Sequence, residues 1–456
     1  MTATYIQRLA DFVVNHDLQP TEASLQWVRY ALFDTFGCLL IGASSEVASM
    51  TQAIYRSQAE KSQDVGARVF GTSLTLPLEA AAFLNATAAH ALDMDDWEVP
   101  GNSHASAILI PSLIAAGADT ELSGEEVTAA YIAGNEVIAV LGEAVNFDHY
   151  SRGWHATGTL ASIGAAAAVA KLWNLSTTQT ANALSIAVAR AAGLTKQFGS
   201  HTKAMQAGFA AENALRAATL ARHGLAGQMD VLEGRQGYLT LTGDFDPNKH
   251  ARAFNRLGRR LAIDEYGIVL KPYPCCGYTH RLMDCARKLH DPRRTAKDIA
   301  SIHLYLPDFH AAILPYRHPE NLKQALFSLP FCTANALLTN NLTVQDLEDE
   351  VWKKKSIKDL ISKSMVTAVE RKNPTLNYDP QQPDRLEVKL NDGSVLKAAA
   401  AFPLGSPQKP MSERQLIEKF IENARRFKLP KNQDIQRLLG WQKQRNIHPL
   451  LEAIGI

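Results

Sequence analysis

The chain has 456 residues, of which 46% are hydrophobic and 20% are charged. This length is enough for roughly two or three domains with sizeable cores. The 47 Lys and Arg residues nearly balance the 46 Asp and Glu residues, and the net charge of +1 provides no strong field to hold a polyanion. We therefore expect a globular protein that does not bind nucleic acid.

The sequence also argues against a membrane or secreted location. Its longest nearly apolar stretches, 105–118 and 161–170, are shorter than the ~20 residues that span a bilayer. The first 14 residues form an amphipathic pattern that includes Arg8 and Asp11, without the cleavage site of a secretion leader. The five cysteines are odd in number and lack the spacing of a disulfide framework. We expect a cytoplasmic protein with no membrane partner.

The first half of the chain predicts a series of helices. Apolar residues at helical spacing predict one long core helix over 21–41, which ends at Gly42. Further helices are predicted over 78–92, 103–117, 123–143, 156–172, 176–192 and 205–223. Ser123 and Ser176 are placed to cap two of them. Ala and Gly are dense in 156–170, which lets helix backbones approach closely and predicts a central, shielded helix.

The pattern changes after about residue 268. A strand is predicted over 299–306, and 385–390 and 394–402 predict a hairpin joined by Asn391-Asp392-Gly393. Helices are predicted between these strands, over 320–338 and 344–351, so this part is of the α+β class. Helical patterns return at 412–427 and in the last residues. The pattern leaves open whether this tail rejoins the first helices.

The strongest candidate site is the stretch from His90 to Trp97, which carries Asp93, Asp95 and Asp96. Carboxylates this close repel one another, and the negative end of the predicted helix dipole destabilises their charges further. This cost favours a functional reason for keeping them. Ser103 is predicted to cap the next helix.

That cap would place His104 in the first helical turn, where the dipole keeps an imidazole neutral and available as a general base. A packing role for His104 is the alternative. A metal site of His90, Asp93 and His104 lacks an HExxH motif or repeated ligand spacing, and we predict no metal.

Three other segments carry candidate residues. His155 and Thr157 lie near the N-terminus of the small-residue helix, a position that favours an anion or a neutral imidazole. Lys203 precedes the helix predicted from 205 and could pair with a substrate carboxylate, although a lone Lys is more often a surface residue. The loop from Lys271 to His280 contains two prolines and lies at the expected domain junction.

Several common motifs are absent from the sequence. It contains no GxGxxG after a strand, no GxxxxGK[ST] and no GxSxG. Nucleotide chemistry and hydrolase-type acyl transfer therefore lack their usual supports. Acid–base chemistry without a cofactor remains.

The segments that carry the candidate residues, taken in their order along the chain, resemble the MmgE/PrpD family. This family includes 2-methylcitrate dehydratase, cis-aconitate decarboxylase and iminodisuccinate epimerase. The resemblance extends to the segments 131–137, 153–158, 232–237, 327–330 and 403–410. It implies a large helical domain formed by both chain ends (1–268 and 403–456), an inserted α+β domain (269–402), a homodimer, and a cleft without metal or organic cofactor at the domain junction.

The resemblance also implies which residues do the chemistry. The implied catalytic residues are Asp93, His104, His155, Lys203 and His280. The implied substrate-binding residues are Asp93, Trp97, His155, Lys203, Lys271, His280 and Phe331. The decarboxylase branch carries Thr where Trp97 stands and Tyr where Phe331 stands. Two hydroxyl donors are thus missing, which argues against decarboxylation of cis-aconitate, and Trp97 would favour a smaller or differently shaped acid.

The resulting hypothesis is a lyase acting on a small di- or tricarboxylic acid. His104 removes a proton α to a carboxylate, Lys203 neutralises the charge that develops, and His155 and His280 hold substrate or return a proton. Asp93 orients a histidine or accepts a hydrogen bond. Expulsion of a hydroxyl gives a 2-methylcitrate dehydratase-like reaction, which we favour. The alternatives are an epimerase of an aminodicarboxylate such as iminodisuccinate, a non-catalytic helical dimer that binds a carboxylate, and a metal-dependent hydrolase.

Overall fold

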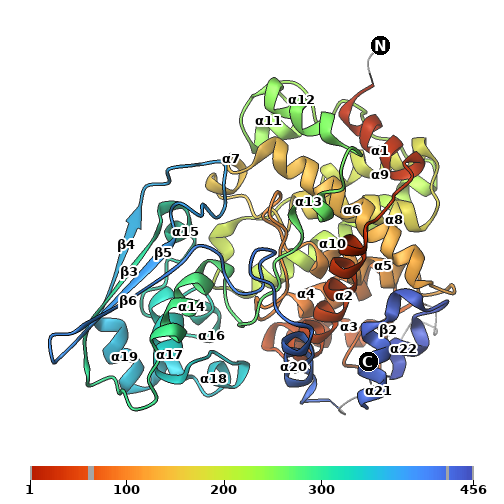
Figure 1. Ribbon diagram of the computed structural model, residues 1–456. Coiled ribbons are helices and arrows are strands. Elements are labelled where there is room, and N and C mark those ends of the chain that lie inside the picture. The colour runs from red at the N-terminus through yellow and green to blue at the C-terminus, as the bar shows by residue number, and fades with distance from the viewer. Residues whose placement is uncertain (1–2, 60–65, 428–430, 454–456) are drawn as a thin grey trace.

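The computed structural model describes residues 3–59, 66–427 and 431–453. It is mainly α-helical with a smaller α+β part (Figure 1). The helices before residue 268 are α1 (Tyr5–Asn15), α2 (Glu22–Ala43), α3 (Glu46–Ala59), α4 (Leu78–Ala89), α5 (Ser106–Ala116), α6 (Gly124–Val145), α7 (Asp148–Ser151), α8 (Leu160–Leu172), α9 (Thr177–Val188), α10 (His201–Arg222), α11 (Tyr238–Thr242), α12 (Pro247–Arg256) and α13 (Ala262–Tyr266). A short antiparallel pair, β1 (Ala67–Arg68) and β2 (Thr75–Leu76), precedes α4.

The α+β part follows in the chain. Its elements are α14 (His280–Leu289), β3 (Ile299–Pro307), α15 (Asp308–Ile313), α16 (Leu322–Ala325), α17 (Leu329–Thr339), α18 (Val344–Glu348), α19 (Lys355–Ser362), β4 (Ser364–Val369), β5 (Asp384–Leu390) and β6 (Val395–Ala400). The chain ends in α20 (Glu413–Ala424), α21 (Asn432–Leu439) and α22 (His448–Ala453).

The core of the helical array contains α8, which is buried from Leu160 to Ala170, as its small residues predict. Its backbone approaches α6 closely. A Cβ on Gly134 of α6 would lie 2.8 Å from the carbonyl oxygen of Gly164, so both helices need glycine at this crossing. The capping boxes predicted from Ser123 and Ser176 are both present and begin α6 and α9.

The four strands of the α+β part are ordered β4-β3-β5-β6. β3 and β4 are parallel, and the other pairs are antiparallel. The predicted hairpin is confirmed as β5 and β6, with Gly393 at φ 90° in its turn. α14 packs against β5 and β6, and α17 packs against α14. This packing fixes the position of the loop that leads into α14, which contributes to the site.

The C-terminal helices pack on the first helices of the chain (Figure 1). The ring of Phe420 in α20 lies 4.6 Å from that of Phe33 in α2. Trp441, which follows α21, donates from its indole nitrogen to the carbonyl of Arg29 at 3.2 Å. Residues from both ends of the chain therefore share one core.

Several helix boundaries differ from the prediction: α4 ends at Ala89 and not at residue 92, α8 begins at Leu160 and not at residue 156, and α9 ends at Val188 and not at residue 192. Three further differences have a visible cause. The helix expected from Ser103 begins at Ser106, because the Ser103 hydroxyl donates to Glu98 at 2.8 Å instead of capping. The helix expected over 320–338 is divided into α16 and α17, since Pro330 lies in the first turn of a helix that Ser328 caps. The helix expected from 205 begins at His201, which places Lys203 inside its first turn.

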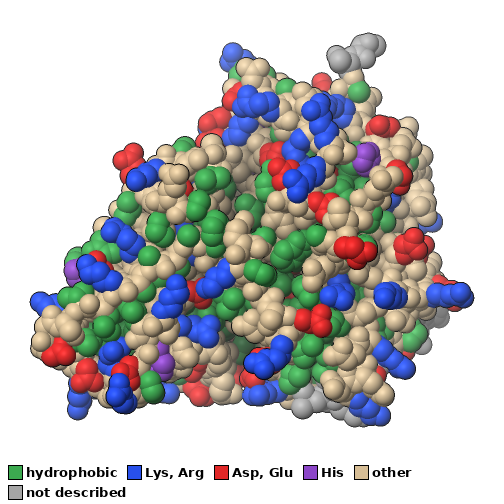
Figure 2. Space-filling model, viewed as in Figure 1, with side chains coloured by type: hydrophobic (Ala, Val, Ile, Leu, Met, Phe, Trp, Pro, Cys, Tyr) green, Lys and Arg blue, Asp and Glu red, His purple; other side chains and the backbone are tan. Residues whose placement is uncertain are grey.

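The surface drawn in Figure 2 carries basic and acidic side chains interspersed with apolar ones. No single described helix has both the length and the apolar composition needed to cross a membrane. Within the described ranges, one bent pair meets that test when its two parts are taken together: α2 and the segment Glu46–Arg56 of α3, with a bend of 76° between them.

Candidate active site

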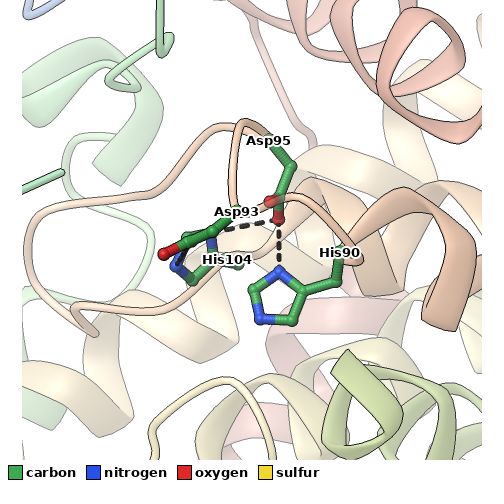
Figure 3. A group of neighbouring side chains, drawn as sticks. All are labelled: His90, Asp93, Asp95 and His104. Atoms are coloured by element: carbon green, nitrogen blue, oxygen red, sulfur yellow. Dashed lines mark hydrogen bonds and ion pairs between the residues drawn. The ribbon is translucent and has the colours of Figure 1, made fainter. Parts of the chain in front are cut away.

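The loop between α4 and α5 holds the centre of the site. α4 ends at Ala89, and His90 is its C-terminal cap residue. Three residues later the backbone turns at Asp93, whose φ of 51° lies in the left-handed region that non-glycine residues seldom adopt. The turn brings Asp93, Asp95 and His104 close to His90, with potential ligand atoms of all four within 4.8 Å of one another (Figure 3).

Two buried lysines converge on Asp93. Lys203, in the first turn of α10, donates to Asp93 Oδ1 at 2.9 Å. Lys271, in the loop after α13, donates to the same oxygen at 2.6 Å and to the Asp93 carbonyl at 2.9 Å. Burial opposes ionisation of Asp93, but the two ammonium groups outweigh it and hold its pKa well below the usual range. Asp93 is therefore a carboxylate shared by two cations.

The environment shifts the pKa values of the two lysines in opposite directions. Burial lowers the pKa of Lys203, and Asp93 offsets this only in part. Burial also acts against the charge of Lys271, but Asp93 and Asp95 outweigh it and raise its pKa. Lys203 also lies 6.0 and 5.8 Å from the ring centroids of Phe198 and Phe327. Lys203 is thus the cation of the pair that gives up its proton more readily.

His104 lies between two carboxylates. Its Nε2 is 3.5 Å from Asp93 Oδ1, and its Nδ1 is 3.0 Å from Asp95 Oδ2. Burial, with Lys271, lowers the pKa of His104 to about 3, so the imidazole is uncharged at neutral pH. The sequence predicts an uncharged ring here, but the predicted cause is wrong, because α5 begins two residues after His104 and does not contain it.

His90 faces Asp95 from the other side. Its Nδ1 lies 2.8 Å from Asp95 Oδ2, and its ring meets that of His104 edge to face at 4.4 Å. Burial lowers the pKa of His90, so this ring is also uncharged. Burial opposes ionisation of Asp95 too, but His90 and His104 outweigh it and place its pKa well below the usual range. Asp95 is therefore ionised although its side chain is fully buried.

His155 forms a third uncharged imidazole beside the first two, with its ring stacked 5.9 Å from that of His90. Gln206 of α10 donates its amide N–H to the Leu194 carbonyl, which turns its oxygen toward His155 Nδ1. Nδ1 of His155 must then carry the proton, leaving Nε2 unprotonated. Burial and the charge of Lys203 hold the pKa of His155 well below the usual range.

The third carboxyl group of the loop differs from the other two. Burial raises the pKa of Asp96 to about 8, and the Ser106 hydroxyl donates to it at 2.5 Å. Asp96 therefore keeps its proton at neutral pH. The repulsion expected among the three neighbouring carboxylates is relieved, because Asp93 faces ammonium groups, Asp95 faces imidazoles and Asp96 is uncharged.

A lysine from the C-terminal end of the chain supports this loop. Lys419 of α20 donates to the Met94 carbonyl at 2.7 Å and pairs with Asp34 of α2 at 2.6 Å. All three residues are buried. The loop that carries Asp93 and Asp95 is thus fixed by a charged group 325 positions further along the sequence.

A cavity of about 30 Å³ opens beside His104 and Lys271. It is lined by Trp97, Asn102, His104, Tyr150, Lys271, Cys276, Gly277 and Tyr278. The space holds about one or two water molecules and is smaller than a di- or tricarboxylic acid. Trp97 occupies one wall, and its indole N–H has no hydrogen-bond partner among the described residues. Burial and Asp93 raise the pKa of Cys276 to about 12, so it remains a thiol.

Two predicted site residues lie apart from this cluster. His280 begins α14, and its Nε2 lies 3.2 Å from the Cys275 carbonyl. Phe331 lies in α17, where it packs edge-on against Trp352 at 6.1 Å. Neither belongs to the wall of the cavity described above. The structure brings together the other predicted residues, Asp93, Trp97, His104, His155, Lys203 and Lys271.

Some residues of the site carry no assigned role in the sequence-based hypothesis. They are Asp95, Tyr150, Gln206, Cys276 and Tyr278. Asp95, Cys276 and Tyr278 lie inside stretches that the sequence singles out. Nothing in the sequence points to Tyr150 or Gln206.

His90, Asp93, Asp95 and His104 also have the donor atoms of a divalent metal site. However, the ammonium groups of Lys203 and Lys271 contact the Asp93 oxygen that such a metal would need. Their two positive charges already balance Asp93 and Asp95. The arrangement therefore favours neutralisation by ammonium groups over a bound metal.

Comparison with known proteins identifies the family. Residues 7–249 match the MmgE/PrpD N-terminal domain, and residues 273–442 match the MmgE/PrpD C-terminal domain. The human cis-aconitate decarboxylase is 26% identical over 421 residues, which cover 89% of this chain and 84% of the human protein. The cis-aconitate decarboxylase of Aspergillus terreus is 25% identical over 461 residues, which cover 94% and 91%. The chain belongs to the MmgE/PrpD family.

Proposed function

We propose that this protein is a cofactor-independent lyase that removes a proton α to a carboxylate of a small di- or tricarboxylic acid and then expels a hydroxyl group, as 2-methylcitrate dehydratase does. One observation carries the proposal. Two buried ammonium groups and an uncharged imidazole meet at Asp93 beside a cavity. Removal of such a proton places negative charge on the adjacent carboxylate, and preorganised cations stabilise that charge in a site shielded from water.

The proposed roles follow the charge states of the side chains. His104 is the base, because its low pKa leaves it unprotonated and it lines the cavity. Lys203 and Lys271 bind a substrate carboxylate, each donor contributing on the order of 3 kcal/mol to stabilising the enolised form. After the abstraction, protonated His104 gives its proton to the departing hydroxyl, which leaves as water. His155, whose Nε2 is unprotonated, accepts a hydrogen bond from the substrate, and Asp93 positions the two lysines. Contacts of His280 and Phe331 with substrate stay predictions.

Substrate binding requires the walls of the cavity to separate, since its volume is about 30 Å³. Trp97 and His104 belong to one side, and Cys276 and Tyr278 belong to the other. We propose that these sides are the helical domain (1–268 and 403–456) and the inserted α+β domain (269–402). A homodimer in the cytoplasm completes the proposal, as the family resemblance implies.

A second candidate reaction is decarboxylation of a tricarboxylate. The names of the relatives favour it, because the human and Aspergillus terreus proteins are cis-aconitate decarboxylases. Trp97 argues against it, because its bulk reduces the space beside Lys271 and it offers no hydroxyl group. Epimerisation would use the same base and cations but return the proton to the opposite face.

One experiment separates these reactions. The protein is incubated with citrate-like, tartrate-like and aminodicarboxylic acids and with cis-aconitate in deuterated water, and proton NMR follows each acid. Appearance of an alkene with loss of a hydroxyl supports the lyase, whereas loss of CO2 or an inverted centre supports the alternatives. A protein that binds an acid without proton exchange would be a binding module, and the proposal would be wrong.

Variants test the proposed residues in the same assay. His104→Gln and Lys203→Ala should each reduce turnover at least about a hundredfold while the fold is retained. His223→Gln serves as the control, because His223 is an exposed residue at the end of α10. Equal activity of the His104 variant and this control would exclude His104 as the base.

A further inference from the structure

A series of hydrogen bonds leads from a buried arginine to the wall of the small cavity. The bonds form a relay of five side chains: Arg281, His310, Asn377, Asn102 and Tyr278. All five are buried, and the last two line the cavity. Asn102 lies in the loop between α4 and α5, whereas the other four belong to the α+β part. The relay therefore joins the two parts of the fold at the site.

The guanidinium group at the start of the relay determines the direction of the next bonds. Arg281 can only donate, and its Nη2 lies 3.3 Å from His310 Nδ1, so this Nδ1 accepts and carries no proton. An imidazole keeps at least one proton, which must then be on Nε2. His310 Nε2 therefore donates to Asn377 Oδ1, at 3.2 Å. Burial and Arg281 hold the pKa of His310 well below the usual range, in agreement with a ring that has a single proton.

The two amide groups carry the same direction to Tyr278. Because the oxygen of Asn377 accepts from His310, its Nδ2 is left to donate to Asn102 Oδ1, at 3.3 Å. Asn102 then presents its own Nδ2 to the hydroxyl oxygen of Tyr278, at 2.9 Å. The oxygen of Tyr278 is thus an acceptor, and its hydrogen is the last donor of the relay.

The hydroxyl hydrogen of Tyr278 has only a poor acceptor in Asn102. Asn102 Oδ1 lies 3.1 Å from the hydroxyl, but it belongs to the same amide whose Nδ2 already donates to that hydroxyl. Both partners lie on one side of the hydroxyl oxygen, so the two bonds cannot both be well aligned. Asn102 Oδ1 also accepts from Asn377. Burial raises the pKa of Tyr278, so the hydroxyl keeps its hydrogen and can donate it to a better acceptor in the cavity.

We propose that Tyr278 binds substrate by donating its hydroxyl hydrogen to a carboxylate, and that Arg281 is a positioning residue that acts on this hydroxyl through the relay. A carboxylate is a stronger acceptor than the amide oxygen of Asn102, because it is charged. Stacking of the Tyr278 ring on His310, with centroids 4.0 Å apart, holds the hydroxyl in place.

The inference rests on the proposed function, in which Lys203 and Lys271 hold one carboxylate of a di- or tricarboxylic acid. That function places Tyr278 on the side of the cavity opposite His104, where a second carboxylate of the acid can accept from it. Tyr278 would then provide a hydroxyl donor in a site where Trp97 offers none.

Replacement of Tyr278 by Phe tests the role by removing only the hydroxyl group. Isothermal titration calorimetry measures binding of citrate and of tricarballylate, which is citrate without its hydroxyl group. The Kd of both acids should rise by about 10- to 150-fold, as expected for a lost hydrogen bond to a charged group. A loss confined to citrate would overturn the inference, because the acceptor would then be the hydroxyl group of the acid.

Tyr273→Phe is the matched control. Tyr273 is a buried tyrosine of the same loop, but its hydroxyl donates to Asp284 at 3.0 Å and it does not line the cavity. This variant should bind both acids as the wild type does. An equal loss in Tyr273→Phe and Tyr278→Phe would overturn the inference, because removal of any hydroxyl from this loop would then weaken binding.

Two measurements test the relay. Histidine 15N NMR of the wild type, with His310→Gln used to assign the signals, should show His310 protonated on Nε2 and unprotonated on Nδ1. Asn377→Leu removes the donor to Asn102 and should raise the Kd of both acids by about 2- to 10-fold. In the Tyr278→Phe background the same substitution should cause no further loss, since no hydroxyl is left to orient. A further loss there would mean that Asn377 acts on the fold alone, and the relay would be wrong.

The remaining outcomes separate the inference from the proposed function. A wild-type His310 protonated on Nδ1 would overturn the relay, even if a variant did not fold. Unchanged affinities in folded Tyr278→Phe, or a wild type that binds neither acid, would overturn the role of Tyr278. If acids bound but none were turned over, the proposed function would fail, while the affinities would still decide whether Tyr278 holds a carboxylate.

Discussion

Replacing Asp93 by Asn should remove the carboxylate that contacts two buried ammonium groups, so that only Asp95 remains to offset their charge. Lys203 and Lys271 lie 2.9 and 2.6 Å from the same Asp93 oxygen. At an effective dielectric constant of about 20, unit charges at 2.9 Å attract by about 6 kcal/mol. Because relaxation and water recover part of this energy, removal of one partner of a buried ion pair costs about 3–5 kcal/mol of unfolding free energy.

The prediction is tested by a double-mutant cycle of Asp93→Asn and Lys203→Met, followed by urea denaturation. The double variant should be more stable than the sum of the single losses predicts by at least about 1 kcal/mol, because Lys203→Met removes one of the uncompensated charges. In Asp93→Asn, stability should rise as pH rises above neutrality. Lys203 then binds its proton more weakly in the folded than in the unfolded chain, so the unfolded chain binds more protons.

Asp96→Asn provides the control, since it replaces an uncharged buried carboxyl group on the same loop and should cost much less than Asp93→Asn. Additive losses in the cycle, to within about 0.5 kcal/mol, would refute the claim that Asp93 compensates these charges. An Asp93→Asn variant as stable as the wild type would refute it too.

Three further predictions concern pH, the C-terminal support and metal ions. The kcat/KM should not fall between pH 8 and pH 5, because His104, with a pKa of about 3, stays unprotonated in that range. At alkaline pH the kcat/KM should fall as Lys203 loses its proton. An inflection near the usual histidine pKa of about 6.5 would contradict the assignment of His104 as the base. Lys419→Met should cost about 3–5 kcal/mol of unfolding free energy in urea denaturation and lower kcat. Arg425→Met breaks an exposed pair at the C-cap of the same helix and should cost less than about 1 kcal/mol, so equal losses would exclude a special role for Lys419. EDTA should leave activity unchanged relative to a sample dialysed without chelator, because Lys203 and Lys271 supply the positive charge of the site. A loss of activity that a divalent metal restores would contradict this prediction.

The sequence predicted the helices whose ends depend on local chemistry. Ser123 and Ser176 cap the helices that they were expected to begin, because a cap needs only residues within one turn. Ser103 was also expected to cap a helix, but it lacks the Glu or Gln three residues later that completes a capping box, and it does not cap α5. Its hydroxyl donates instead to Glu98, five residues earlier in the same buried turn. A serine before an apolar run therefore does not by itself define where a helix begins.

The site residues also differ in whether local sequence or tertiary packing determines their arrangement. Sequence motifs identify four residues of the site: Asp93, His104, Lys203 and Lys271. That both lysines contact one oxygen of Asp93 depends on the packing of α10 and of the loop after α13, which the motifs do not show. The contacts of Asp95 depend on the left-handed turn at Asp93, which brings His90 and His104 to one carboxylate oxygen. Spacing along the chain indicates which groups are present but not which of them remain charged.

The link from Lys419 to the Met94 carbonyl has a consequence for synthesis of the protein. During translation, the three acidic residues of the loop leave the ribosome long before α20 is synthesised. Until then Asp34 lacks its partner, and the loop lacks one of its anchors. Activity should therefore develop late during translation, and premature termination before α20 would yield a polypeptide with most of its helices but an imperfectly ordered centre.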